Sequence, residues 1–102
     1  MVIKKTENGS NLEIKVEGRL DTTTAPQLET EINGLDSGVT DLVFDLEALE
    51  YISSAGLRVL LCAQKIMNKQ GKMTIRNVNE GIMEVFEITG FVDILTIEYR
   101  MH

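Results

Sequence analysis

Two consecutive serines, Ser53 and Ser54, stand between an apolar strand pattern and a long helical pattern. Where a helix begins, backbone N–H groups lack helical partners and lie at the positive end of the helix dipole. A hydroxyl there could carry a phosphate, because the unpaired donors and the dipole both favour an anion. A serine at such a position can also act only as a helix cap, which is the more common role. The pattern alone leaves both interpretations open.

Hydrolytic chemistry at these serines is not favoured. His102 is the only histidine and ends the chain, so a Ser-His-Asp arrangement would require the terminus to fold onto Ser54. The residues around Ser54 also lack the Gly-x-Ser-x-Gly pattern of a nucleophile elbow. The one cysteine, Cys62, has no partner for a disulfide or a metal site, and we expect it to be a small buried apolar residue. We therefore expect no enzyme, no cofactor and no metal.

Gly56 and the basic residues after it are further candidates. A glycine one turn into a helix costs roughly 1 kcal/mol of helix propensity relative to alanine, so it needs a reason such as close approach by another backbone. Because glycine has no side chain, Gly56 would leave bare backbone surface at this turn, to which a partner protein could bind. Arg58, Lys65 and Lys69 fall on one flank of the helix. They could meet an acidic partner, although a solvated helix face is the simpler interpretation.

The elements that must position these residues begin with a hairpin. Residues 2–7 and 12–17 flank Asn8-Gly9, a dipeptide suited to tight hairpin turns. Apolar and charged residues alternate in the second segment, which predicts one buried face and one wet face. We expect this pair at or near the edge of the sheet.

A first helix should start near Thr24, because Thr24 and Gln27 have the spacing of a capping box. Gly34 or Gly38 would then let the chain leave the helix through a left-handed turn. Residues 42–46 form a nearly continuous apolar run, which is typical of a central parallel strand covered on both faces.

The long helix follows from about Ala55 to Gln70, and Gly71 supplies its stop. We expect a short strand over residues 73–76, a third helix capped by Asn79 that reaches towards Gly90, and a last strand over residues 94–99. The fold class is therefore α/β, with a mixed sheet, an N-terminal hairpin, two parallel strand-helix-strand crossovers and three main helices.

Composition limits the functions that this fold can have. The chain has 102 residues, 43% of them hydrophobic, which is enough for one domain spanning residues 1–102. A formal net charge of -6 disfavours direct binding of nucleic acid. The first residues lack the apolar stretch of a signal peptide, and no run is long enough to cross a bilayer. We expect a cytoplasmic protein without membrane insertion, of undetermined oligomeric state.

Two segments resemble a known family. Tyr51-Ile52-Ser53-Ser54-Ala55-Gly56-Leu57, within the segment from Asp45 to Leu61, is similar to the signature of the STAS-domain anti-sigma factor antagonists of bacteria. Gly18-Arg19-Leu20-Asp21 resembles the second marker of that family, which ends a strand before the first helix. The expected element order and the length also match, so the resemblance covers essentially the whole chain.

The resemblance implies a phosphorylation switch. Ser54 matches the serine that an anti-sigma factor, itself a serine kinase, phosphorylates in the family, and a metal-dependent serine phosphatase removes the phosphate. The unphosphorylated antagonist binds the anti-sigma factor and releases the sigma factor. Asp21 would lie near Ser54, where it could orient the hydroxyl or help to recognise the partner. The partner-binding residues that the resemblance implies are Asp21, Thr22, Ser53, Ser54, Ala55, Gly56, Leu57 and Arg58.

Two alternatives remain open. The family often has aspartate where this chain has Ser53, so Ser53 is an alternate phosphorylation site. The protein could also be a constitutive STAS scaffold subunit of a transporter or a signalling complex that is never phosphorylated. A Ser54→Asp variant separates these functions, because only the switch predicts that partner binding is lost.

Overall fold

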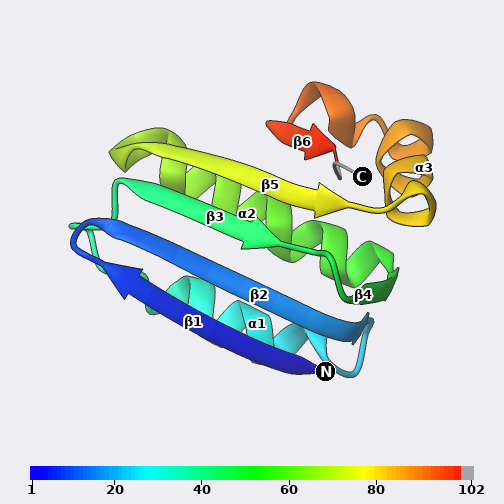
Figure 1. Ribbon diagram of the computed structural model, residues 1–102, viewed down its shortest axis with the longest axis horizontal. Helices are drawn as coiled ribbons and strands as arrows, with labels where there is room; N and C mark the ends of the chain where they lie inside the picture. The colour runs from blue at the N-terminus through cyan, green and yellow to red at the C-terminus, as the bar shows by residue number, and fades with distance from the viewer. Residues whose placement is uncertain (100–102) are drawn as a thin grey trace.

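A mixed six-stranded sheet forms the centre of the computed structural model, which describes residues 1–99 (Figure 1). Strands β1 to β6 cover Val2–Asn8, Asn11–Leu20, Asp41–Asp45, Leu49–Ile52, Lys72–Val78 and Ile97–Tyr99. Helices α1, α2 and α3 cover Ala25–Asn33, Ser54–Gln70 and Glu80–Thr89, and a 3-10 turn covers Phe91–Asp93. The strand order is β1-β2-β3-β5-β6, and β4 pairs with β2. The α/β class predicted from the sequence is confirmed.

The N-terminal hairpin is confirmed, with β1 at the edge of the sheet. Strands β1 and β2 pair antiparallel from Val2↔Glu17 to Asn8↔Asn11, and Gly9 in the turn adopts a φ of +64°. The apolar side chains of β2 are buried, and the charged side chains that alternate with them face the open side of the sheet. The alternation in the sequence therefore assigned the two faces of this strand correctly.

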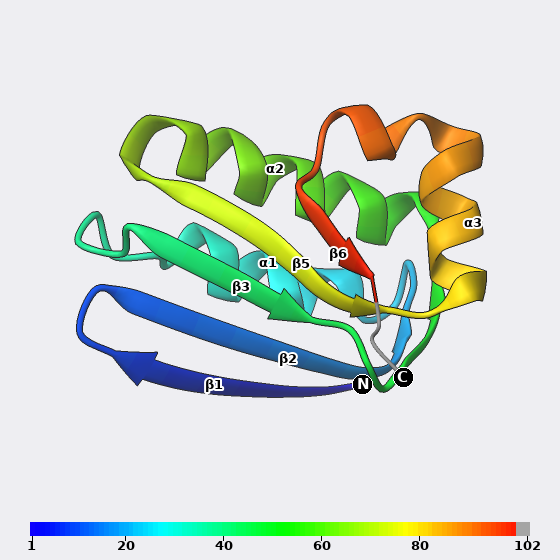
Figure 2. The same cartoon turned by 45° about the horizontal axis from the view of Figure 1, so that its top comes forward.

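Parallel connections account for the remaining strands. Strand β2 pairs parallel with β3, and β3 with β5, which are the two crossovers predicted through α1 and α2. A third parallel connection leads through α3 from β5 to β6. Helices α1 and α2 lie side by side on one face of the sheet, and α3 lies at its end beyond β4 (Figures 1 and 2).

The expectation that both faces of β3 are covered is wrong. Leu42 and Phe44 are fully buried, whereas Val43 between them is only half-buried. The face without helices carries ion pairs such as Lys4 to Glu17, at 3.1 Å, and that face is open to solvent. Val43 is a single β-branched residue on the open side of the sheet. Because it lies between two buried apolar residues, the sequence showed a continuous apolar run, which is also the pattern of a strand buried on both faces.

The first helix begins at Ala25, close to the predicted start, but its capping box is absent. The Thr24 side chain makes no cap hydrogen bond to α1; its hydroxyl donates to the carbonyl of Arg19 at 2.8 Å and accepts from the N–H of Asp21 at 2.9 Å. The expected left-handed exit is also wrong, because Gly34 has a φ of −93° and Gly38 is not among the glycines with positive φ. The last turn satisfies the Gly34 N–H through the Thr30 carbonyl, so no left-handed residue is needed.

The later helices end as expected. Gly71 stops α2 in an extended conformation, and a Cβ there would collide with the Thr40 carbonyl. Asn79 caps α3 by accepting from the Ile82 N–H at 2.9 Å, and Gly90 ends α3 at a φ of +80°. The last strand starts at Ile97, later than expected, because a turn and a bend follow the 3-10 turn at residues 94–95.

Two features were not foreseen. Strand β4, over Leu49–Ile52, pairs parallel with the end of β2 from Gly18↔Leu49 to Leu20↔Ile52. Cys62 is exposed on α2, so its predicted burial is wrong. Within the described residues, no helix is long and apolar enough to cross a membrane.

Candidate functional site

The turn between β4 and α2 holds the two serines beside the end of β2. The N–H of Ser53 donates to the carbonyl of Leu20 at 2.9 Å, which extends the β2–β4 pairing by one more bond. Asp21 follows Leu20 directly, so Asp21 and Ser53 leave the sheet next to each other. The structure therefore brings the two sequence motifs to the same end of the molecule.

The two serines have different roles in this turn. Ser53 is the N-cap of α2: its backbone is extended, its Oγ accepts from the Gly56 N–H at 3.5 Å, and its carbonyl accepts from the Leu57 N–H at 3.0 Å. Ser54 is the first residue of α2 and is exposed. Within residues 1–99, neither its hydroxyl nor its N–H has a hydrogen-bond partner. The capping role thus belongs to Ser53, and the hydroxyl of Ser54 faces solvent beside an unpaired N–H group.

Gly56 packs tightly against the ends of two strands. An ideal Cβ at Gly56 would lie 2.7 Å from Cγ of Leu20 and 2.9 Å from Cγ1 of Ile52, both of which are buried. The close approach expected from the sequence exists, but side chains and not another backbone make it. Gly56 is buried, so the expected bare surface is absent.

Burial separates the predicted partner-binding residues into two groups. Gly56 and Leu57 are buried and can only shape the turn. Thr22, Ser54 and Arg58 are exposed. The remaining members, Asp21, Ser53 and Ala55, are half-buried.

Asp21 is committed to its own loop. Its Oδ1 accepts from the N–H groups of Thr23 and Thr24, at 3.0 and 3.1 Å, and lies 3.2 Å from the Thr24 hydroxyl oxygen. The hydrogen bond from the Thr24 N–H is the main reason why the pKa of Asp21 lies below its ordinary value, and the guanidinium of Arg19 adds to this effect. Within residues 1–99 this carboxylate makes no hydrogen bond to Ser54. Orientation of the Ser54 hydroxyl by Asp21 stays a prediction.

Arg19 and Tyr51 lie at the same turn, and the sequence analysis did not single them out. They are paired residues of β2 and β4, and the guanidinium carbon of Arg19 lies 4.3 Å from the centre of the Tyr51 ring. Nε of Arg19 is 3.6 Å from Oδ2 of Asp21. Arg19 and Tyr51 are neighbours only because β2 pairs with β4. The sequence of β4 has no alternating pattern, so it did not predict this strand or its pairing.

Exposed cations continue along α2 from the turn. Arg58, Lys65 and Lys69 are all exposed, and none forms an ion pair within residues 1–99. All three residues lie on α2, as the sequence predicted. Their contact with an acidic partner stays a prediction.

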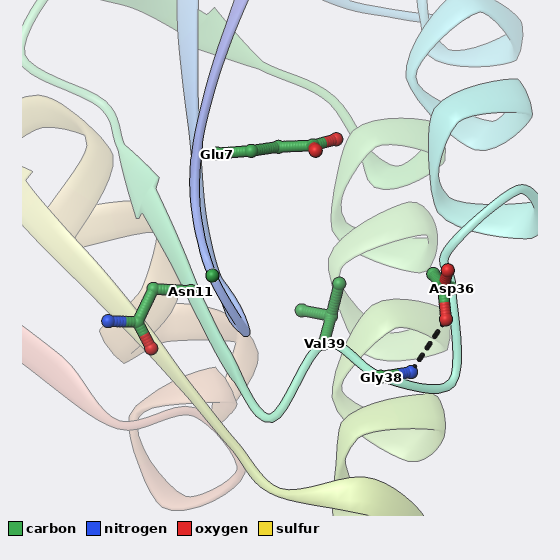
Figure 3. A pocket seen from close by; sticks show the side chains of 6 residues that line it. Glu7, Asn11, Asp36, Gly38 and Val39 are labelled. Atoms are coloured by element: carbon green, nitrogen blue, oxygen red, sulfur yellow. Dashed lines mark hydrogen bonds between the residues drawn. The ribbon is translucent and has the colours of Figure 1, made fainter.

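The cavity shown in Figure 3 does not belong to this site. Glu7, Asn11, Asp36 and Val39 are among its lining residues, which places it at the hairpin end of β2. Asn11 and Leu20 are the two ends of β2, which at 3.3 Å per residue lie about 30 Å apart. The cavity therefore lies at the opposite end of β2 from the serine turn.

These observations define a class of protein: a small α/β domain with a mixed sheet that presents a free serine at the start of a helix beside the end of a neighbouring strand. The sequence model of the STAS domain matches residues 2–102. The chain belongs to the STAS domain family.

Similar proteins carry one recurring name. BtrV of Bordetella bronchiseptica, provisionally named an anti-sigma factor antagonist, is 40% identical over 84 residues, which are 80% of this chain and 72% of BtrV. The anti-sigma-B factor antagonist of Bacillus subtilis is 31% identical over 95 residues, which are 92% of this chain and 87% of that protein.

Solved structures show the same fold. An anti-sigma factor antagonist from Mycobacterium paratuberculosis superposes with a TM-score of 0.83 at 23% identity, covering 94% of this chain and 83% of that one. The phosphorylated form of the Bacillus protein SpoIIAA superposes with a TM-score of 0.78 at 17% identity, covering 99% and 93%.

Proposed function

We propose that this protein is an anti-sigma factor antagonist that is switched off by phosphorylation of Ser54. In the unphosphorylated form it binds an anti-sigma factor and so releases the sigma factor. The anti-sigma factor is a serine kinase that phosphorylates Ser54, and a metal-dependent serine phosphatase restores the active form. The protein is a substrate of these enzymes and not an enzyme itself, and it acts in the cytoplasm with its sigma factor. The names of its relatives support this function.

The observation that supports Ser54 most strongly is the division of roles between the two serines. The Ser54 hydroxyl is exposed and unpaired within residues 1–99, whereas Oγ of Ser53 accepts the Gly56 N–H as the helix cap. A phosphate on Ser53 would disturb this cap. A phosphate on Ser54 would instead lie near unpaired N–H groups at the positive end of α2, so the domain would keep its fold.

Phosphorylation would change the binding surface by its charge. A phosphoserine carries a charge of about −1.5 to −2 at neutral pH. A partner that contacts the unmodified turn would have to desolvate this charge, and any carboxylate that it places there would be repelled. The switch therefore requires no change of fold.

The test is phosphorylation by the anti-sigma kinase from the same genome. The protein is incubated with this kinase and ATP, and the modified residue is mapped by mass spectrometry in the wild type, Ser53→Ala and Ser54→Ala. We expect one phosphate on the wild type and on Ser53→Ala, and none on Ser54→Ala. Absence of phosphate from both serines of the wild type would refute the switch.

A second measurement compares partner binding. Ser54→Asp should weaken binding of the anti-sigma factor, with Ser37→Asp on the exposed loop before β3 as a charge-matched control. Equal binding of Ser54→Asp and the wild type would instead favour the constitutive scaffold.

A further inference from the structure

We propose that Arg19, held in place by Tyr51 and Asp21, is the residue that recognises the anti-sigma factor at this turn, through a carboxylate of that partner. This inference rests on the proposed function and names one contact of its binding surface. It also assigns a different role to Asp21, which positions Arg19 and does not contact the partner directly.

The first step of the argument is that the Asp21 carboxylate is already used. One oxygen accepts hydrogen bonds from the N–H groups of Thr23 and Thr24, and the other lies 3.6 Å from Nε of Arg19. An ionised carboxylate accepts and cannot donate, so few of its acceptor sites remain for a partner. Asp21 is therefore better suited to holding this loop and Arg19 than to forming a new intermolecular bond.

The second step is that the Arg19 side chain is held in place by its neighbours but still has free hydrogen-bond donors. Its guanidinium is placed over the Tyr51 ring at 4.3 Å, and its only ion pair within residues 1–99 is to Asp21 through Nε. Arginine has five N–H donors in a planar fork. The donors on its two terminal nitrogens have no partner among the described residues, and the side chain is 60% exposed. The planar guanidinium of Arg19, with free N–H donors, matches the geometry of a carboxylate. Because the side chain is already held in place, it loses little conformational entropy when it binds a carboxylate.

The third step is position. Arg19 and Tyr51 are paired residues of β2 and β4, and the next pair, Leu20 and Ile52, leads directly to Asp21 and Ser53. A partner that covers Ser54 would therefore also reach Arg19. Tyr51 is 42% exposed, and exposed Tyr and Arg side chains are the types that most often dominate the energy of protein interfaces.

Charge indicates the chemistry of the partner. The chain has a net charge of -6, yet two exposed arginines, Arg19 on β2 and Arg58 on α2, lie on the elements that meet at the serine turn, together with the carboxylates of Asp21 and Glu50. A phosphate on Ser54 would add a charge of about −1.5 to −2 to this turn, where the two arginines are offset by the two carboxylates. A carboxylate of the anti-sigma factor would bind the free donors of Arg19 in the unmodified turn and would be repelled by a phosphate on Ser54.

The experiment measures binding of the full-length protein to the anti-sigma factor from the same genome, by surface plasmon resonance at several salt concentrations. Arg19→Gln should weaken the affinity about 10-fold or more and flatten the salt dependence of the association rate. The affinity of Arg19→Lys should lie between those of Arg19→Gln and the wild type, because lysine keeps the positive charge but lacks the planar guanidinium that can form two hydrogen bonds to a carboxylate. Tyr51→Leu should weaken the affinity about threefold or more but keep the salt dependence, because the charge remains.

Lys72→Gln is the matched control, since Lys72 is an exposed cation at the hairpin end of the sheet. It should bind within about twofold of the wild type. Thermal unfolding should be nearly the same for Arg19→Gln and the wild type, because surface substitutions change stability by roughly 0.5 kcal/mol or less. A carboxylate-to-lysine variant of the partner should restore binding to Arg19→Glu.

The outcomes separate the inference from the proposed function. If the wild type binds and Arg19→Gln binds equally well with the same salt dependence, the inference is refuted and the proposed function stands. If the wild type binds through Arg19 but phosphorylation of Ser54 has no effect, the switch is refuted and the contact stands. If the wild type binds no anti-sigma factor, both are refuted.

Discussion

The substitution Gly56→Ala tests how the serine turn is built. An ideal Cβ at Gly56 would lie 2.7 Å from Cγ and 3.0 Å from Cδ2 of Leu20, and 2.9 Å from Cγ1 of Ile52. Carbon atoms normally meet at about 3.5–4.0 Å, so the new methyl group must displace its neighbours. Leu20 is fully buried and Ile52 is 3% exposed, so neither side chain can move aside into solvent.

Two opposing terms set the size of the effect. Alanine gains about 1 kcal/mol of helix propensity over glycine. Inserting a methyl group into a packed core costs typically about 1–3 kcal/mol. The net loss of stability should therefore be about 1 kcal/mol, which lowers the melting temperature by roughly 4–8 °C in a domain of this size.

Urea unfolding followed by circular dichroism measures this change, and Gly81→Ala is the matched control. Gly81 also lies in the first turn of a helix, but a Cβ there would meet only Oδ1 of Asn79, at 3.5 Å, which is ordinary contact. Gly81→Ala should therefore raise the stability by up to about 1 kcal/mol. A Gly56→Ala variant as stable as the wild type would show that packing at the turn is not tight, and the argument would fail.

Three further predictions concern caps and charge. Ser53→Ala should lower the free energy of unfolding by about 0.5–1 kcal/mol through loss of the N-cap, whereas Ser54→Ala should change it by less than about 0.5 kcal/mol; equal losses in urea titrations would contradict the assigned roles. Asn79→Ala should cost about 2 kcal/mol, because it removes both the α3 cap and the bond from Nδ2 to the Leu49 carbonyl, at 2.9 Å; a smaller loss than for Ser53→Ala would contradict this. The pKa of Asp21 is lower in the folded protein than its ordinary value of 3.8, so its contribution to stability is complete above that pH and is lost as the pH falls through the folded pKa. Asp21→Asn should therefore lose less stability than the wild type when thermal unfolding is compared between pH 5 and pH 2.

Local rules predicted much of the chain. The hairpin at Asn8-Gly9, the cap at Asn79 and the end of α3 near Gly90 depend on contacts between residues close in sequence. The start of α2 was predicted to within a residue for the same reason. Such elements are encoded by short-range chemistry, and the order of the strands and helices other than β4 followed from them.

Features that depend on distant residues were missed or mistaken. Strand β4 lacks an alternating pattern, and it is a strand because β2 continues past β3 and offers it an edge. Cys62 was expected to be buried because free cysteines usually are, yet its place on the outer side of α2 exposes it. The apolar run of β3 could not show that helices cover only one face of the sheet.

The sequence by itself determined the order of the elements other than β4, the family resemblance and the two adjacent serines at the start of a helix, because these follow from residue types and short spacings. Only the tertiary structure decided that Ser53 is the cap and Ser54 the free hydroxyl. Only the pairing of β2 with β4 placed Arg19 over Tyr51 and beside Asp21. These assignments depend on which strands become neighbours, and packing of the whole chain settles that.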